Sequence, residues 1–137
     1  MCGYVGSTIK KDVNDDRPLI WLGTSKRDIS AFPDDVKLIM GFALRLAQKG
    51  MKHQRAKPMK GFGGAGVLEI VDDSDGDTYR VIYTVIFDDA VYGLHAFQKK
   101  SKKGKETSKT DLKMIERRLK MALEHHEALA KARKKDG

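Results

Sequence analysis

The sequence predicts an α+β fold, with helices packed on one face of a small, antiparallel-rich sheet. Between residues 67 and 99, three apolar runs alternate with short acidic segments, which is typical of a three-stranded meander. Residues 33–50 and 108–124 instead repeat apolar side chains three and four positions apart, as amphipathic helices do. A chain of 137 residues with 40% hydrophobic residues fits one globular domain.

The first third of the chain is predicted to contain a flexible lead-in, a short strand and a helical turn. Residues 1–17 lack an apolar pattern and are expected to form a flexible lead-in. The apolar run at 18–23 (PLIWLG), bounded by turn formers, predicts a strand, and 25–31 predicts a helical turn. The folded domain is expected over residues 18–124, followed by a basic, frayed tail at 125–137.

A longer helix is predicted from Pro33 to Gly50. Proline suits the first helical position, and Asp34 and Asp35 favour the positive end of the helix dipole. Glycine is typical just beyond a helix C-terminus. The predicted buried stripe contains Val36, Ile39, Met40, Ala43, Leu44 and Ala47.

The second half predicts a loop, a meander and a last helix. Residues 51–66 are basic and then glycine-rich, as in a loop. Strands are expected at 67–71, 79–87 and 91–99, with hairpin turns at 72–77 and 88–89. Ser108 or Thr110 is expected to cap the last helix, ahead of Asp111 in its first turn. The buried face of that helix is predicted to contain Leu112, Ile115, Leu119 and Ala122.

Charge is distributed unevenly along the sequence. Residues 1–94 contain 13 Lys/Arg and 13 Asp/Glu, whereas residues 95–137 contain 14 and 6, so the net charge of +8 lies in the last third. This asymmetry indicates an anionic partner, with nucleic acid ahead of acidic protein or an anionic membrane.

Cysteine usage and hydropathy predict a cytoplasmic protein. Cys2 is the single cysteine, which excludes an internal disulfide and fits a reducing compartment. No apolar run approaches the length of a membrane span. No cofactor is expected, and no metal site either, because no His, Cys or carboxylate set has ligand spacing. The acidic segment 72–77 lacks the full calcium-loop pattern and predicts a turn.

Arg80 and Glu69 are predicted to share the polar face of the sheet. A turn centred near residues 74–75 would place Glu69 across from Arg80. The pair is interpreted both as a cross-strand ion pair and as a device that orients Arg80 toward phosphate.

The second hairpin allows two registers. A two-residue loop places His95, Phe97 and Lys99 on the face of Arg80, whereas a three-residue loop places Ala96, Gln98 and Lys100 there. The longer loop is favoured because Phe97 suits a core. His95 is then as well explained by a buried, hydrogen-bonded role as by catalysis.

Six segments together resemble the RelE/ParE superfamily of bacterial toxins, in particular its phage-related HigB-like branch. They are PLIWLG (18–23), FALRLAQKG (42–50), KPMKGFGGAGVLEI (57–70), TYRVIYTV (78–85), LHAFQKKSKKG (94–104) and IERRL (115–119). The chain departs from the pattern at Thr107-Ser108, where these proteins usually have Thr-Pro. Val71 stands where many relatives carry arginine, which removes one phosphate contact.

The resemblance implies an endoribonuclease that cleaves mRNA in the ribosome, neutralised by a cognate helix-turn-helix antitoxin. RNA cleaves when its 2′-OH attacks the adjacent phosphate, so the protein need only orient and stabilise. Arg80 would hold the phosphate oxygens and Glu69 would orient it. His95 would act as a base, and Lys99 or Lys100 as an acid or second cation. The predicted RNA-backbone contacts are Lys57, Lys60, Lys102, Lys103 and Lys105.

Three other functions are considered. ParE-like relatives with this fold poison DNA gyrase without cleaving RNA, and the cations would equally suit a non-catalytic RNA- or ribosome-binding module with steep salt dependence. Met1-Cys2-Gly3 is also found at the start of amidotransferase domains, but residues 4–16 supply no matching strand pattern.

Overall fold

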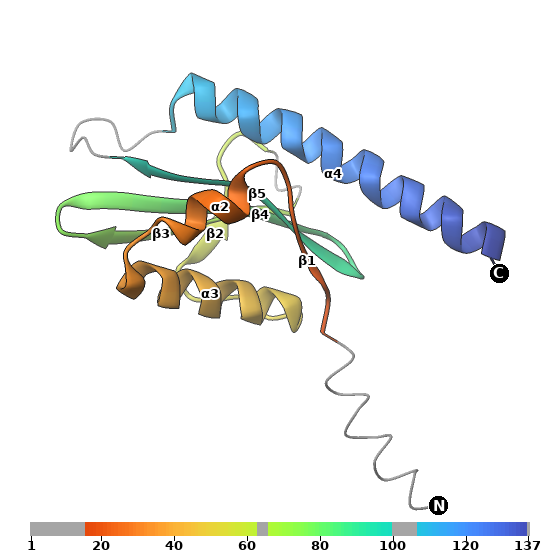
Figure 1. The fold of residues 1–137 in the computed structure, drawn as a ribbon, viewed down its shortest axis with the longest axis horizontal. Helices are drawn as coiled ribbons and strands as arrows, with labels where there is room; N and C mark the ends of the chain where they lie inside the picture. The colour runs from red at the N-terminus through yellow and green to blue at the C-terminus, as the bar shows by residue number, and fades with distance from the viewer. Residues whose placement is uncertain (1–15, 63–65, 100–106, 137) are drawn as a thin grey trace, which may run out of the picture.

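The computed structural model describes residues 16–62, 66–99 and 107–136. Five strands form one mixed sheet in the order β1-β5-β4-β3-β2, with helices above and below it (Figure 1). The elements are β1 (Leu19–Trp21), α2 (Ser25–Ser30), α3 (Asp34–Gln48), β2 (Ala56–Pro58), β3 (Val67–Ser74), β4 (Asp77–Phe87), β5 (Ala90–Lys99) and α4 (Lys109–Asp136). No helix in the described part of the chain is long and apolar enough to cross a membrane.

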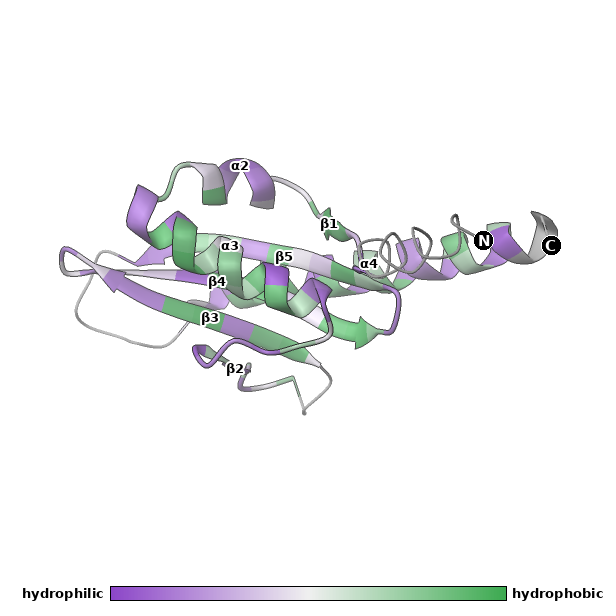
Figure 2. Cartoon of the chain, turned by 90° about the horizontal axis from the view of Figure 1, so that it is seen from below, coloured by the Kyte–Doolittle hydropathy of each residue, from purple (hydrophilic) through white to green (hydrophobic). Residues whose placement is uncertain are grey.

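The α+β class is confirmed, but the expectation that helices pack on a single face is wrong. Helix α3 lies on one side of the sheet, α4 crosses the other, and α2 lies beside the edge of the sheet near β5 (Figures 1 and 2). Each face therefore has its own apolar cluster. Val81 and Tyr83 of β4 point toward α3, whereas Ile82 of the same strand joins Ile115 of α4. The nearly continuous apolar run in β4 is typical of a strand that is buried on both faces.

Two edge strands complete the sheet around the predicted meander. The first, β1, pairs in parallel with β5, with Leu19 opposite Val91. The second, β2, lies within the segment predicted as a loop and pairs antiparallel with β3, with Lys57 opposite Glu69. Sequence pattern misses β2 because three residues that include a proline are too short to show alternation.

The β3–β4 turn lies one residue later than predicted. Asp75 and Gly76 occupy the turn, with φ values of 51° and 85°, and Ser74 pairs with Asp77. Positive φ at both positions is characteristic of an Asp-Gly type I′ turn. Arg80 consequently faces Val71 across the ladder rather than Glu69, although all three side chains remain on the same face of the sheet.

The register favoured for the second hairpin is also wrong. Phe87 pairs with Ala90, which leaves a two-residue loop, and Arg80 pairs with Phe97. Phe97 nevertheless reaches a core, because α4 covers this face and the ring packs partly buried beneath it. Lys99 therefore shares the face of Arg80, and Lys100 lies outside the described residues.

Helix α4 begins as predicted and extends beyond residue 124. The Ser108 hydroxyl accepts a hydrogen bond from the Asp111 amide at 3.1 Å, which confirms the Ser108 cap. The helix continues to Asp136, through the segment in which fraying was expected. Two contacts hold this half against the β4–β5 turn: His126 Nε2 lies 2.6 Å from an Asp89 oxygen, and Arg133 donates to the other oxygen at 2.8 Å.

The far half of α4 should respond to acid through Asp89. Hydrogen bonds from Arg133 and then His126 lower the pKa of Asp89 from 3.8 to about 2. Because the pKa of Asp89 is lower in the folded state, the ionised carboxylate stabilises the fold above the unfolded pKa, and this contribution is lost as pH falls from about 5 to about 1. Asp89→Asn should therefore lower the free energy of unfolding at pH 6, with the difference from wild type shrinking as pH falls and disappearing only below the folded pKa, near about pH 1. Urea titrations across this range test it, with Asp88→Asn as the exposed neighbouring control.

Candidate functional site

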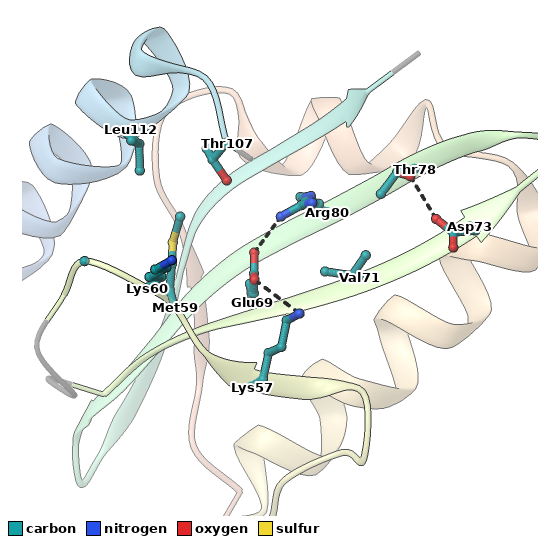
Figure 3. Close-up of a pocket in the computed structure, with 11 residues that line it drawn as sticks. Lys57, Met59, Lys60, Glu69, Val71, Asp73, Thr78, Arg80, Thr107 and Leu112 are labelled. Carbon is teal, nitrogen blue, oxygen red and sulfur yellow. Dashed lines mark hydrogen bonds and ion pairs between the residues drawn. The ribbon is translucent and has the colours of Figure 1, made fainter. Parts of the chain in front are cut away.

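A cavity of about 630 Å³ opens on the α4 side of the sheet, where strands β2, β3 and β4 meet the start of α4 (Figure 3). Charged, hydroxyl and apolar side chains share its wall. The lining residues are Lys57, Met59, Lys60, Gly61, Glu69, Val71, Asp73, Thr78, Arg80, Thr107 and Leu112.

Arg80 and Glu69 form the charged centre of this cavity. Arg80 Nη1 donates to Glu69 Oε2 at 3.1 Å, and the side chains of both residues are only 10% exposed. The other Glu69 oxygen, Oε1, lies 3.8 Å from the Lys57 ammonium, which is 63% exposed. Figure 3 shows the Glu69 carboxylate between the two cations. Glu69 therefore orients both the buried guanidinium of Arg80 and the solvent-facing ammonium of Lys57. This arrangement presents fixed positive charge to an anion that enters the cavity.

The rest of the wall combines apolar and hydroxyl groups. Val71 lies directly opposite Arg80 in the ladder, so the departure from arginine at this position leaves an apolar surface beside the guanidinium. Leu112 contributes a second apolar group from α4. Thr78 donates to an Asp73 carboxylate oxygen at 2.8 Å, farther along the same strands. An apolar surface next to a cation suits a ligand that carries both an anionic group and a flat ring.

The structure brings together four of the predicted site residues and separates others. Lys57, Lys60, Glu69 and Arg80 line the cavity. Lys99 pairs across the ladder with Thr78, which is also in the wall, so it lies near the cavity without lining it. The remaining predicted lysines, Lys100, Lys102, Lys103 and Lys105, lie outside the described residues.

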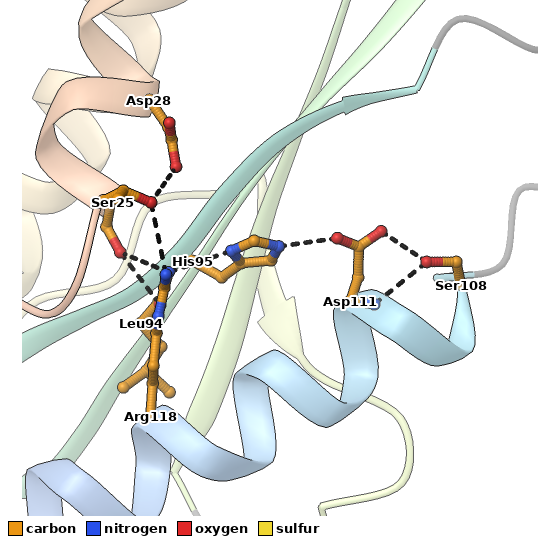
Figure 4. A network of polar contacts seen from close by, with 8 residues as sticks. Ser25, Asp28, Leu94, His95, Ser108, Asp111 and Arg118 are labelled. Atoms are coloured by element: carbon orange, nitrogen blue, oxygen red, sulfur yellow. Dashed lines mark hydrogen bonds and ion pairs between the residues drawn. The ribbon is translucent and has the colours of Figure 1, made fainter.

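His95 belongs to a separate polar network between β5 and α4 (Figure 4). Its Nε2 lies 2.8 Å from an Asp111 carboxylate oxygen, and its Nδ1 lies 3.3 Å from Arg118 Nη1. Because an arginine nitrogen can only donate, Nδ1 accepts and Nε2 carries the proton. His95 is 9% exposed and its ring stacks on Phe97 with centroids 5.0 Å apart. Both ring nitrogens are thus engaged, and His95 does not line the cavity around Arg80.

Arg118 is the centre of this network and was not identified from the sequence as functionally or structurally special. It is 6% exposed and donates to the Leu94 carbonyl at 3.0 Å and to the Ser25 hydroxyl at 3.2 Å. Burial lowers the pKa of Arg118, while the Asp28 carboxylate opposes that shift. Its position three residues after Ile115 in the apolar stripe was the available signal, since a basic residue there must be buried with partners.

The sequence comparison places these features in a known family. The fold and the cavity define a small α+β protein of RelE-like architecture with a cationic site on its sheet. Residues 27–120, more than half of the chain, match the family described as phage derived protein Gp49-like (DUF891), and the chain belongs to this family. The family consists of RelE-like toxins of toxin–antitoxin systems, which implies an antitoxin partner. Neither the curated proteins nor the solved structures gave a significant match.

The described ranges contain no group of three or more His, Cys, Asp or Glu side chains positioned to hold a metal ion. The charged side chains that line the cavity among the described residues are Lys57, Lys60, Glu69, Asp73 and Arg80.

Proposed function

We propose that this chain is the toxin of a type II toxin–antitoxin module and acts as a metal-independent endoribonuclease on mRNA in the ribosome. The observation that carries the proposal is the buried Arg80 guanidinium, oriented by Glu69 inside a cavity that is lined by two further cations. A cognate helix-turn-helix antitoxin would neutralise it in the cytoplasm. Assignment to the HigB-like branch is part of this proposal.

The proposed reaction is an internal transesterification of RNA. The 2′-oxygen attacks the adjacent phosphorus and loses its proton, while the bond to the 5′-oxygen breaks and that oxygen gains a proton. The products are a 2′,3′-cyclic phosphate and a 5′-hydroxyl. Arg80 stabilises the negative charge that grows on the non-bridging oxygens, where one well-placed donor contributes about 3–4 kcal/mol.

The remaining residues are assigned by their place around Arg80. Glu69 holds the guanidinium in position, and Lys57 and Lys60 contact the RNA backbone. Lys99 protonates the leaving oxygen or shares the charge. We assign His95 to positioning rather than to proton removal, because both of its nitrogens are already engaged by Asp111 and Arg118.

A two-target assay separates the proposed activity from its rivals. Purified protein incubated with translating ribosomes should yield cleaved mRNA with 2′,3′-cyclic phosphate ends. Inhibition of DNA gyrase without cleavage would indicate a ParE-like toxin. Salt-dependent RNA binding with no cleaved product would indicate a non-catalytic binding module.

A further inference from the structure

A second hollow lies on the opposite face of the sheet from the Arg80 cavity. This groove, of about 330 Å³, runs between β1 and the helices α2 and α3. Its floor is apolar and consists of Leu19, Trp21, Ile29 and Leu44. Among the described strands, none pairs with the outer edge of β1, so the groove lies beside an edge of the sheet.

Gly41 occupies the lip of this groove in the middle of α3, where glycine is unfavourable. Glycine is the poorest helix former after proline. A Cβ added at Gly41 would meet no described atom within 4 Å, so the packing of the chain does not explain the residue. Gly23 provides a contrast, because a Cβ there would lie 2.7 Å from the Arg118 guanidinium. A helical glycine beside an open apolar groove leaves room for the backbone of another molecule to approach the helix closely.

The rim of the groove is positively charged. Lys26, Lys37 and Arg45 line it, and none of the described lining residues is acidic. Lys37 has one ion pair, to an Asp34 side chain that is 97% exposed and therefore weakly held. The end of α3 already binds one carboxylate: Asp16 lies 3.1 Å from Arg45, in the extended segment that leads into β1.

We propose that this groove receives an amphipathic segment of the antitoxin that inserts a large apolar side chain beside Gly41 and presents carboxylates to Lys26 and Lys37. The apolar floor selects the inserted side chain, and the cationic rim selects the charge that flanks it. The inference rests on the proposed function, since it takes the antitoxin as the partner. It assigns antitoxin binding to the face that does not carry the Arg80 cavity.

The test fills the groove without changing the cavity. Gly41→Leu should weaken binding of the protein encoded by the adjacent reading frame at least tenfold in calorimetry, and Lys26→Glu should weaken it severalfold. Leu38→Trp, which adds bulk at an exposed α3 position outside the groove, and Lys113→Glu on α4 are the matched controls and should retain wild-type affinity. RNA cleavage by free Gly41→Leu should equal that of wild type.

Each alternative result has a distinct meaning. Unchanged affinity of Gly41→Leu for that protein overturns the groove assignment and leaves the toxin proposal intact. If the wild-type chain does not bind the protein encoded by the adjacent reading frame, both the antitoxin proposal and this inference are wrong. If the wild-type chain binds that protein but does not cleave RNA, only the catalytic proposal is wrong. If wild type forms a dimer that Gly41→Leu abolishes, or if deleting residues 1–15 tightens binding of the probe, a second copy or the chain's own N-terminus occupies the groove and the inference is wrong.

Discussion

Replacing Arg80 by lysine is expected to lower the rate of RNA cleavage about 100- to 1000-fold, the usual effect of losing one transition-state donor. Lysine keeps the positive charge next to Glu69, so the buried carboxylate retains a cationic neighbour. It loses the planar set of donors that can hold two phosphate oxygens at once, and it cannot reproduce the orientation that Glu69 gives to the guanidinium. Cleavage of ribosome-bound mRNA in single-turnover kinetics is the measurement.

A second arginine supplies the matched control for this substitution. Arg55 Nη1 lies 3.0 Å from an Asp72 carboxylate oxygen, in a similar ion pair on the other face of the sheet. Arg55→Lys should therefore cleave RNA at the wild-type rate. Thermal unfolding of both variants establishes that each is folded. Equal cleavage by wild type and Arg80→Lys would show that only net charge matters and would refute the proposed role of Arg80.

Most helices and strands follow from the sequence because their apolar periodicity is long enough to be unambiguous. Residues 34–48 show one continuous stripe, and β4 carries a nearly continuous apolar run over residues 81–87. The exceptions have physical causes. β2 has only three residues, so its identity depends on pairing with β3. The parallel partner of β1 is likewise set by tertiary structure, since no local pattern specifies which strand lies beside it.

The registers of the hairpins were the main obstacle to predicting the site. The β3–β4 turn is set by the two positive φ values at Asp75 and Gly76, and the sequence DDSDGD offers several acidic positions for it. In the second hairpin, Phe97 favoured the wrong register because helices were expected on one face. Once α4 covers the second face, an aromatic residue beside Arg80 is buried as well.

The chemistry of the cavity was partly predictable from residue type alone. The predicted ion pair between Arg80 and Glu69 forms although the register differs, because both residues occupy the same face at either spacing. The sequence could not decide between the two roles considered for His95. Its partners Asp111 and Arg118 lie 16 and 23 residues away, so the sequence could not show that both ring nitrogens are bound.

Arg118→Ala is expected to lower the free energy of unfolding by about 2–4 kcal/mol, the effect of leaving several buried polar groups without a donor. The Leu94 carbonyl, the Ser25 hydroxyl and His95 Nδ1 would all lose their contact with the guanidinium. Urea unfolding measures the loss, and Arg117→Ala provides an exposed neighbouring control that should change stability by less than about 0.5 kcal/mol.

The same substitution should change the chemistry of His95. In the wild-type chain Arg118 donates to His95 Nδ1, which must therefore carry no proton. The ¹⁵N NMR spectrum should accordingly show the Nε2–H tautomer of His95. Without Arg118, His95 Nδ1 loses its hydrogen-bond donor, while Asp111 still accepts from Nε2. The ¹⁵N signal of Nδ1 should therefore move to that of a ring nitrogen that accepts no hydrogen bond from the protein. An unchanged Nδ1 signal and an unchanged urea midpoint in Arg118→Ala would show that the buried guanidinium neither stabilises the junction of β5 and α4 nor contacts His95.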